Sequence, residues 1–362
     1  MERIDTYRKW LDKEGMPVIT GHGIADVTAV SLKPWPRKGG RGAYINLVGC
    51  ERITDAYICE MPPGQSPLPQ RHLYEELIYI LSGNGTTTVW VNGRDKQSFE
   101  WQEGSLFSPP LNTWHQHSNA QSDRPAKYIG VTRAPAMMNL FHDLDFIFNN
   151  DFVFKDRYNG TENYFSSQGE VIEDLVEGNR KIWDSNFIPD CRNLELAYYT
   201  KRGGLSANMF LELSNGMMSA HVSELSGGAY LRAHYHGAGD PHLFLSGQGY
   251  ALIWPEAGGI MAEGVERIRI DLQKNSLFVA PERWFDQRFS TGKEPLKYLA
   301  FHTEQSVKYA GLRKGYEGTK SVKIGGTQID YEDEDPEIRR LFKEELARTG
   351  VSWRMSQYFP GE

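Results

Sequence analysis

The sequence contains the same β-rich pattern twice. The segment "AYICEMPPGQSPLPQRH" (56–72) aligns without a gap with "AHVSELSGGAYLRAHYH" (220–236). The match continues at the same spacing as "ILSGNGTTTVW" (80–90) with "FLSGQGYALIW" (244–254), and further on as "GSLFSPP" (104–110) with "NSLFVAP" (275–281). Self-similarity of this kind is typical of a duplicated domain. The chain is therefore predicted to contain two copies of one folding unit.

Each copy is predicted to be all-β. The chain of 362 residues has 36 glycines and 18 prolines, set between short runs rich in valine, isoleucine, tyrosine and phenylalanine, which indicates many short strands with tight turns. We expect an N-terminal domain with an N-terminal extension at 1–150, a connector at 151–205, a C-terminal domain at 206–325 and a helix with a tail at 326–362. The connector is aromatic and acidic, and we expect it to be ordered and to pack across both domains.

The end of the chain predicts one amphipathic helix in "DPEIRRLFKEELARTG". It has proline just inside an aspartate cap, apolar residues at Ile338, Leu341, Phe342 and Leu346, and a closing glycine. We expect this helix to cover a sheet face or a subunit contact in a homo-oligomer.

Composition excludes several classes of partner. The net charge of −7 and the absence of basic runs argue against a nucleic-acid-binding surface. The N-terminus lacks the apolar core of a secretory signal, and no window reaches eighteen uninterrupted apolar residues, so we expect a cytoplasmic protein without a membrane partner. Its three cysteines are scattered, which argues against a disulfide framework or a zinc–thiolate site.

Polar side chains gather where one strand of the first copy ends and the next begins. Gln70 and His72 leave the same face of a strand, but Glu76 would lie about 13 Å further along a straight one. A bend at residues 73–75 would bring Glu76 back opposite His72, at the start of an antiparallel return strand. Glu75, the neighbour of Glu76, is then expected to face solvent because adjacent strand residues point oppositely.

A second polar cluster follows in "GSLFSPPLNTWHQHSN". His115, His117 and Asn119 share a strand face, and an imidazole arriving from a neighbouring strand would complete a set of nitrogen and oxygen donors suited to iron, manganese, nickel, copper or zinc. In the second copy, the corresponding positions are taken by other residues. These are His234, His236, Asp240 and Asp286, which stand for Gln70, His72, Glu76 and His115 in that order.

These motifs resemble those of the cupin superfamily, specifically its two-domain members, the bicupins. "HYHGAGDPHLFLSG" and "QRHLYEELIYILSG" fit the first cupin motif, with Asp240 for its glutamate in one and Gln70 for its leading histidine in the other. "GSLFSPPLNTWHQHSN" fits the second motif, with Asn112 in a glycine place. The resemblance covers more than half of the chain. It implies two jelly-roll barrels (double-stranded β-helices) with a few flanking helices.

The resemblance also implies a divalent transition metal near one end of each active barrel. Transferred residue by residue, it gives His72, Glu76 and His115 as ligands, with Gln70 as a possible fourth. In the second copy it gives His234, His236 and Asp240. There Asp286 either completes the ligand set or pairs with Arg288 in a barrel that has lost its metal. His221, His242 and His302 are expected to be structural.

A metal with few protein ligands keeps open positions, which suit dioxygen activation or Lewis-acid chemistry. "TWHQHSN" is locally similar to gentisate-type ring-cleaving dioxygenases, which favours an Fe(II) dioxygenase acting on a small aromatic or hydroxylated acid, with Glu76 and His117 as catalytic residues. The alternatives are a non-oxidative decarboxylase, lyase or isomerase using Mn or Zn, with Glu76 as a base, and a non-catalytic bicupin that binds a small molecule.

Overall fold

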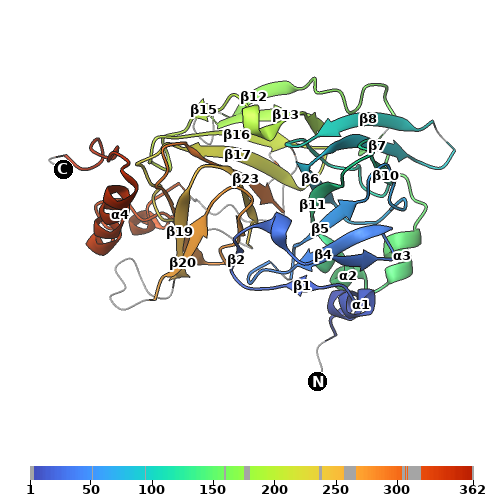
Figure 1. Cartoon of the computed structure of the whole chain (residues 1–362), viewed down its shortest axis with the longest axis horizontal. Helices are drawn as coiled ribbons and strands as arrows, with labels where there is room; N and C mark the ends of the chain where they lie inside the picture. The colour runs from blue at the N-terminus through green and yellow to red at the C-terminus, as the bar shows by residue number, and fades with distance from the viewer. Residues whose placement is uncertain are drawn as a thin grey trace.

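The computed structural model describes residues 4–50, 52–93, 95–158, 160–174, 180–235, 239–256, 266–303, 306, 308 and 319–360. Two β-barrels lie side by side along the long axis of the molecule (Figure 1). Each barrel is a sandwich of one large sheet and one three-stranded sheet. The predicted all-β, duplicated jelly-roll fold is confirmed.

The first barrel has a large sheet with the strand order β1-β4-β5-β11-β6-β9-β14, in which β3 also pairs with β4, and a small sheet with the order β10-β7-β8. The strands of the large sheet are β1 (Val18–Ile19), β3 (Lys33–Trp35), β4 (Gly40–Ile45), β5 (Asp55–Met61), β6 (Glu76–Ser82), β9 (Leu106–Phe107), β11 (Ala126–Thr132) and β14 (Phe187–Ile188). Those of the small sheet are β7 (Asn84–Trp90), β8 (Gln97–Gln102) and β10 (Trp114–Asn119).

The second barrel repeats this plan. Its large sheet has the order β12-β13-β16-β17-β23-β18-β21-β2, with β15 beside β16, and its small sheet has the order β20-β19-β22. The strands of the large sheet are β2 (Gly23–Ile24), β12 (Glu170–Asp174), β13 (Arg180–Asp184), β15 (Ala197–Tyr198), β16 (Ser206–Glu212), β17 (Ser219–Leu225), β18 (His242–Ser246), β21 (Leu277–Phe278) and β23 (Leu296–His302). Those of the small sheet are β19 (Gly249–Pro255), β20 (Ile268–Leu272) and β22 (Trp284–Ser290).

The two large sheets pack against each other. One apolar cluster joins residues of both, such as Ile58 and Leu77 with Val222 and Leu299. The residues that alternate with them along the strands, such as Tyr57 on β5, fill the barrel interiors in two further clusters. Central strands of the large sheets, such as β5 and β6, are therefore buried on both faces, whereas β7 and β10 alternate between buried and partly exposed residues.

The two copies exchange short arms. β2, near the N-terminus, pairs with β21 of the second barrel, whereas β14, which follows the first repeat, pairs with β9 of the first barrel. Each arm continues into a 3-10 helix whose preceding aspartate accepts a hydrogen bond from the backbone, namely η1 (Val27–Ala29) after Asp26 and η2 (Cys191–Asn193) after Asp190. The two arms occupy equivalent positions of the repeats, since they are separated by the same spacing as the segments quoted above. The connector thus contributes strands to both barrels.

Helices flank the barrels at both ends. The first barrel carries α1 (Thr6–Glu14), α2 (Ala134–Phe141) and α3 (Leu144–Asn149), and the 3-10 helix η4 (Val322–Ile324) follows the second barrel. α4 (Pro336–Thr349) is the predicted C-terminal helix, with Asp335 as its N-cap and Gly350 as its C-cap. It lies at the far left of Figure 1 and buries Ile338, Phe342 and Leu346 in the core of the second barrel, while Leu341 is 38% exposed.

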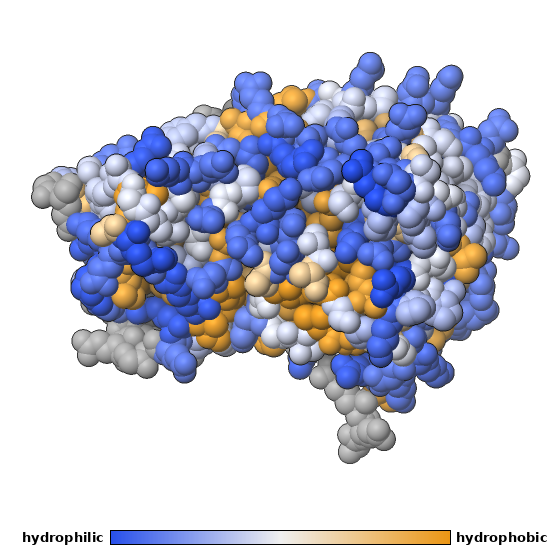
Figure 2. Space-filling model, in the orientation of Figure 1, coloured by the Kyte–Doolittle hydropathy of each residue, from blue (hydrophilic) through white to orange (hydrophobic). Residues whose placement is uncertain are grey.

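The visible face of the molecule is mostly polar, and apolar residues gather at its lower centre (Figure 2). Within the described part of the chain, no helix combines the length and the apolar composition that a membrane span requires.

Candidate metal centre

The three candidate ligands of the first barrel are brought together by a bend between its two sheets. Gln70 exchanges two backbone hydrogen bonds of 2.9 Å with His115, so the chain before the bend lies against β10 of the small sheet. The chain bends at residues 73 and 74, and β6 then begins at Glu76 in the large sheet. The predicted bend is confirmed. The predicted pairing of the return strand with residues 70–72 is wrong, because β6 pairs with β11 and β9 instead.

His115 and its neighbours on β10 obey the predicted alternation. His115, His117 and Asn119 are buried, whereas the residues between them are partly exposed. The turn before β10 places Asn112 at φ 59°, a left-handed conformation that asparagine tolerates better than most residues. Asn112 therefore replaces the motif glycine without a change in the path of the chain.

Two imidazoles and one carboxylate converge inside the first barrel. Glu76 Oε2 lies 3.4 Å from His72 Nε2 and 3.6 Å from His115 Nε2. All three side chains are at most 5% exposed. In the described part of the chain, these residues form the one group of three or more histidine, cysteine or acidic residues whose ligand atoms lie within 4.8 Å of one another.

The hydrogen bonds of the imidazoles fit a metal ion. His72 Nδ1 lies 2.9 Å from the carbonyl oxygen of Tyr74, and His115 Nδ1 lies 3.3 Å from that of Thr113. A carbonyl only accepts, so each Nδ1 must donate its proton, and each Nε2 then carries a lone pair. His72 Nε2, His115 Nε2 and Glu76 Oε2 are buried and have no hydrogen-bond partner. Three acceptor atoms that face one another without a donor from the protein form a set that can hold a cation.

Tyr57 and Lys38 hold the other carboxylate oxygen of Glu76. The hydroxyl of Tyr57 donates a hydrogen bond to Glu76 Oε1, and the ammonium of Lys38 donates to the Tyr57 hydroxyl at 2.8 Å. Burial by itself raises the pKa of Glu76, but the ammonium of Lys38 and the interactions with His72 and His115 outweigh it and hold the pKa well below its usual range. Burial also lowers the pKa of His115. The site thus combines an ionised carboxylate with a neutral imidazole, as metal ligation requires.

The structure gives Gln70 contacts outside this group. Its Oε1 accepts a hydrogen bond from Arg37 Nη1 at 2.7 Å, and its Nε2 lies within hydrogen-bond distance of the backbone carbonyls of Arg37, Leu68 and Pro69. Arg37 is itself held by Glu14 at 2.8 Å. In this conformation the Gln70 amide is hydrogen-bonded to Arg37 and to the backbone of the loop before the bend.

His117 is held by contacts of its own within the barrel. Its Nδ1 is 2.8 Å from Thr87 Oγ1, which also accepts a hydrogen bond from Trp101 Nε1. Its ring packs against Tyr128 and Phe107. Burial lowers the pKa of His117 to about 4, so its imidazole is neutral near pH 7. These contacts place it beside the candidate ligands without showing the catalytic role that the sequence suggested.

In the second barrel, the residues at the positions of the candidate ligands form ion pairs. Asp286 Oδ1 lies 2.7 Å from Arg288 Nη2, and Asp286 Oδ2 lies 3.7 Å from His234 Nε2. Arg288 also contacts the Tyr298 hydroxyl at 2.7 Å and His242 Nε2 at 3.0 Å. Of the two readings of Asp286, these contacts favour its pairing with Arg288.

Asp240 belongs to a chain of hydrogen bonds in the same barrel. Its Oδ2 lies 2.7 Å from His302 Nδ1, and His302 Nε2 lies 2.6 Å from His221 Nδ1. His302 and His221, expected to be structural, are therefore partners of a predicted ligand. His236, the remaining predicted ligand, lies outside the described residues.

Glu75 differs from its prediction. It is 8% exposed rather than solvent-facing, and its carboxylate accepts hydrogen bonds of 2.9–3.0 Å from the backbone of Met217 and Met218. Arg157 also forms an ion pair with it. Glu75 precedes β6, so the alternation of a strand does not govern it, and its side chain instead joins the bend of the first barrel to a loop of the second.

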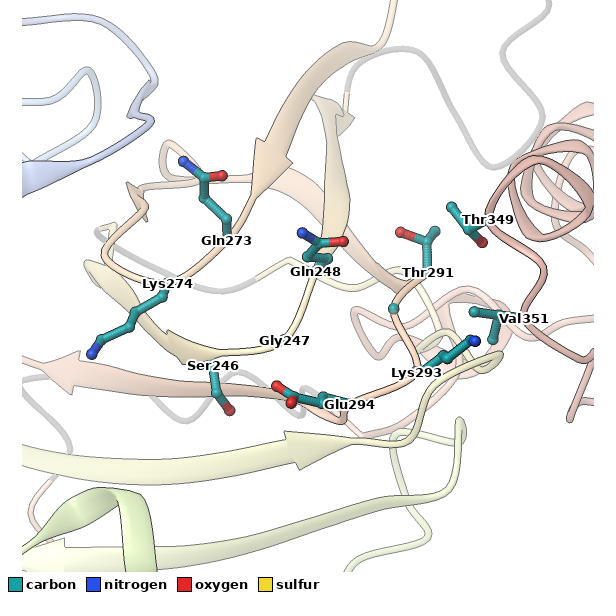
Figure 3. Close-up of a pocket in the computed structure, with 11 residues that line it drawn as sticks. Ser246, Gly247, Gln248, Gln273, Lys274, Thr291, Lys293, Glu294, Thr349 and Val351 are labelled. Atoms are coloured by element: carbon teal, nitrogen blue, oxygen red, sulfur yellow. The ribbon is translucent and has the colours of Figure 1, made fainter.

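A groove of about 690 Å³ lies on the second barrel, away from these residues (Figure 3). Turns 246–248 and 291–294 and the end of α4 line it with short polar side chains and two lysines, Lys274 and Lys293. None of the candidate ligands lines this groove, and Lys274 is paired with Glu103 at 3.2 Å. The groove therefore adds nothing to the candidate metal centre.

Tyr57 and Lys38 were not predicted from the sequence. A signal for Lys38 exists, since the repeat extends upstream of residue 56. "RKGG" at 37–40 corresponds to "KRGG" at 201–204, at the same spacing as the other repeated segments. Arg202 of the second copy thus takes the place of Lys38.

Comparison with known proteins agrees with this architecture. Residues 57–132 match the family described as Cupin domain. A segment of 101 residues is 30% identical to 5-aminosalicylate 1,2-dioxygenase from Comamonas sp, and it represents 27% of this chain and 25% of that protein. The chain thus matches about a quarter of the length of this relative.

Solved structures share the whole fold at low identity. Oxalate decarboxylase from Lactobacillus farciminis, in a formate complex, is 14% identical with a TM-score of 0.53, covering 89% of this chain and 96% of that one. Oxalate decarboxylase from Bacillus subtilis, whose Mn(II) centres have been studied, is 15% identical with a TM-score of 0.50, covering 81% and 80%. Residues 57–132 are thus similar to the cupin domain family, and the whole chain shares the fold of these oxalate decarboxylases.

Proposed function

We propose that this bicupin is a non-haem Fe(II) dioxygenase that acts on a small aromatic or hydroxylated acid. The observation that carries the proposal is the set of three unpartnered acceptors on His72, Glu76 and His115. Two imidazoles and one carboxylate with open positions are the ligand set typical of iron(II) oxygenases. A bound iron ion would supply sites at which the substrate and dioxygen meet.

Two tyrosines hold this set of ligands in place. Tyr74 stacks on the ring of His72, with ring centroids 3.8 Å apart, and holds its tautomer through the backbone carbonyl. Tyr57 fixes the carboxylate of Glu76, which keeps Oε2 directed toward the imidazoles. The local similarity to 5-aminosalicylate 1,2-dioxygenase supports the same substrate class.

A non-oxidative decarboxylase, lyase or isomerase is the second candidate, because the oxalate decarboxylases share the fold and one of them contains Mn(II) centres. The contacts of Gln70 favour the dioxygenase, since they leave three protein ligands rather than four. A small-molecule-binding bicupin without catalysis is the third.

Metal analysis with two activity assays separates these functions. Protein purified without added metal is analysed for iron, manganese and zinc, and then tested for oxygen uptake with hydroxybenzoates in air and for carbon dioxide release in anoxic buffer. Iron with oxygen uptake supports the proposal. Manganese or zinc with anoxic turnover supports the lyase, and less than about a tenth of a metal per chain supports the binding protein.

Ligand variants test the site itself. We expect His72→Ala and His115→Ala to lose metal from the first barrel and activity, with the fold retained, because each removes one of three donors. His142→Ala is the matched control, since His142 is an exposed histidine that contacts Thr6. Full metal occupancy of the first barrel in either ligand variant contradicts the assignment.

A further inference from the structure

Lys38 is a buried cation within the first barrel. It lies in the turn between β3 and β4, and only 4% of its surface is exposed. Its Nζ is 2.8 Å from the Tyr57 hydroxyl and 4.0 Å from the centroid of the Tyr57 ring. Tyr57 in turn contacts Glu76, so the ammonium is one residue away from a candidate metal ligand.

The hydrogen-bonding capacity of Lys38 exceeds what the protein offers. An ammonium has three donors, and in the described part of the chain Tyr57 is the one acceptor that Lys38 Nζ contacts. A buried charged donor without acceptors is costly. The two remaining N–H groups therefore call for oxygen atoms that a ligand or solvent brings into the barrel.

The net charge of the metal-loaded barrel also favours a ligand with oxygen atoms, specifically an anionic one. A divalent ion, Lys38 and the ionised Glu76 sum to two positive charges. The nearby buried carboxyl, Asp55, accepts hydrogen bonds from the Tyr7 hydroxyl at 2.8 Å and from the hydroxyl of Thr132, and in its ionised form it would reduce this sum to one positive charge. Burial lowers the pKa of Lys38, and an anion beside the ammonium would oppose that shift. Buried charge that the protein does not neutralise favours an anionic ligand.

The second barrel provides an internal comparison. Arg202 takes the place of Lys38 there, and the negative charge of Asp286 acts on it. Asp286 corresponds in sequence to His115, which brings no negative charge to the first barrel. The second barrel thus has a carboxylate, Asp286, that acts on Arg202 and has no counterpart in the first barrel, where the carboxylate of the candidate ligand Glu76 acts on Lys38.

We propose that the Lys38 ammonium binds an anionic oxygen of the substrate beside the ion held by His72, Glu76 and His115, and so selects acids over neutral phenols. This inference rests on the proposed function. It names Lys38 as the residue that recognises the acid group. The anionic oxygen would then lie on the same side of the metal ion as Tyr57.

Binding of a matched pair of probes tests this role. The dissociation constants of 2-hydroxybenzoate and of its neutral analogue 2-hydroxybenzyl alcohol are measured by calorimetry on the metal-loaded protein, under anoxic conditions. We expect Lys38→Met to bind the acid about 10-fold more weakly or worse, and the alcohol as the wild type does, with unchanged metal content. Lys33→Met is the matched control, because it makes the same change at an exposed lysine on β3.

The outcomes are separable. The inference is supported if Lys38→Met loses the preference for the acid and Lys33→Met keeps it. Acid binding within twofold of the wild type, or loss of metal by Lys38→Met, overturns it and leaves Lys38 as a structural partner of Tyr57. Lys38→Gln replaces the methionine variant if that does not fold. If the wild-type protein binds neither probe, the proposed function is contradicted as well. The results for the Lys38 variants test the role of Lys38 and do not contradict the proposed function.

Discussion

Replacement of Glu75 by alanine should loosen the contact between the two barrels without removing the metal. The variant leaves two backbone N–H groups, of Met217 and Met218, without their acceptor and deprives Arg157 of its buried partner. Removing one partner of a buried charge pair typically costs about 3–5 kcal/mol. Arg157 is 20% exposed and regains some water, so we expect a loss of about 3 kcal/mol in the free energy of unfolding.

Thermal unfolding measures this effect. In a protein of this size, a loss of about 3 kcal/mol lowers Tm by roughly 5 °C. Glu100→Ala is the matched control, since Glu100 is exposed on β8, and it should change Tm by less than about 1 °C. Metal content of the Glu75 variant should equal that of the wild type, because Glu75 contacts no candidate ligand. A Tm equal to that of the control would refute the reasoning that this carboxylate joins the barrels.

Three further outcomes are expected. Gln70→Ala should keep its metal, because the Gln70 amide is bound to Arg37; metal analysis showing a loss would restore Gln70 as a ligand. Arg288→Met should destabilise the protein by about 3–5 kcal/mol in urea unfolding, because Asp286 is left buried without its cation, while a neutral effect would contradict the ion pair. Burial raises the pKa of Glu334 from 4.5 to about 7, so its contribution to stability is complete below pH 4.5 and is lost as the pH rises through 7. Between pH 5 and 8 the wild type should lose about 2 kcal/mol more than Glu334→Gln, and parallel pH profiles would refute this.

The sequence predicted the parts of the site that depend on repetition and strand alternation. The duplication indicated two barrels, and the spacing of His115, His117 and Asn119 placed them on one buried face. The distance from His72 to Glu76 demanded a bend, which the structure has. Each of these inferences follows from local geometry that a single strand imposes.

The remaining parts depend on contacts between distant segments. The alternation rule failed for Glu75 because the residue lies before β6 and meets a loop of the second barrel, far away along the chain. Gln70 lies on the predicted face, but Arg37, from the turn after β3, holds its amide. No spacing rule within the segment 69–85 foretells such partners, since they come from other segments of the fold.

The exchanged arms make each barrel incomplete by itself. Because β2 adds to the second barrel and β14 to the first, a chain cut between the repeats would leave both fragments with an uncovered sheet edge. Deletion of the N-terminal segment that contains β2 would then destabilise the second barrel, which is synthesised last. During translation, β2 leaves the ribosome early and must wait for its partner β21, so the N-terminal arm can dock only after most of the second barrel has been made.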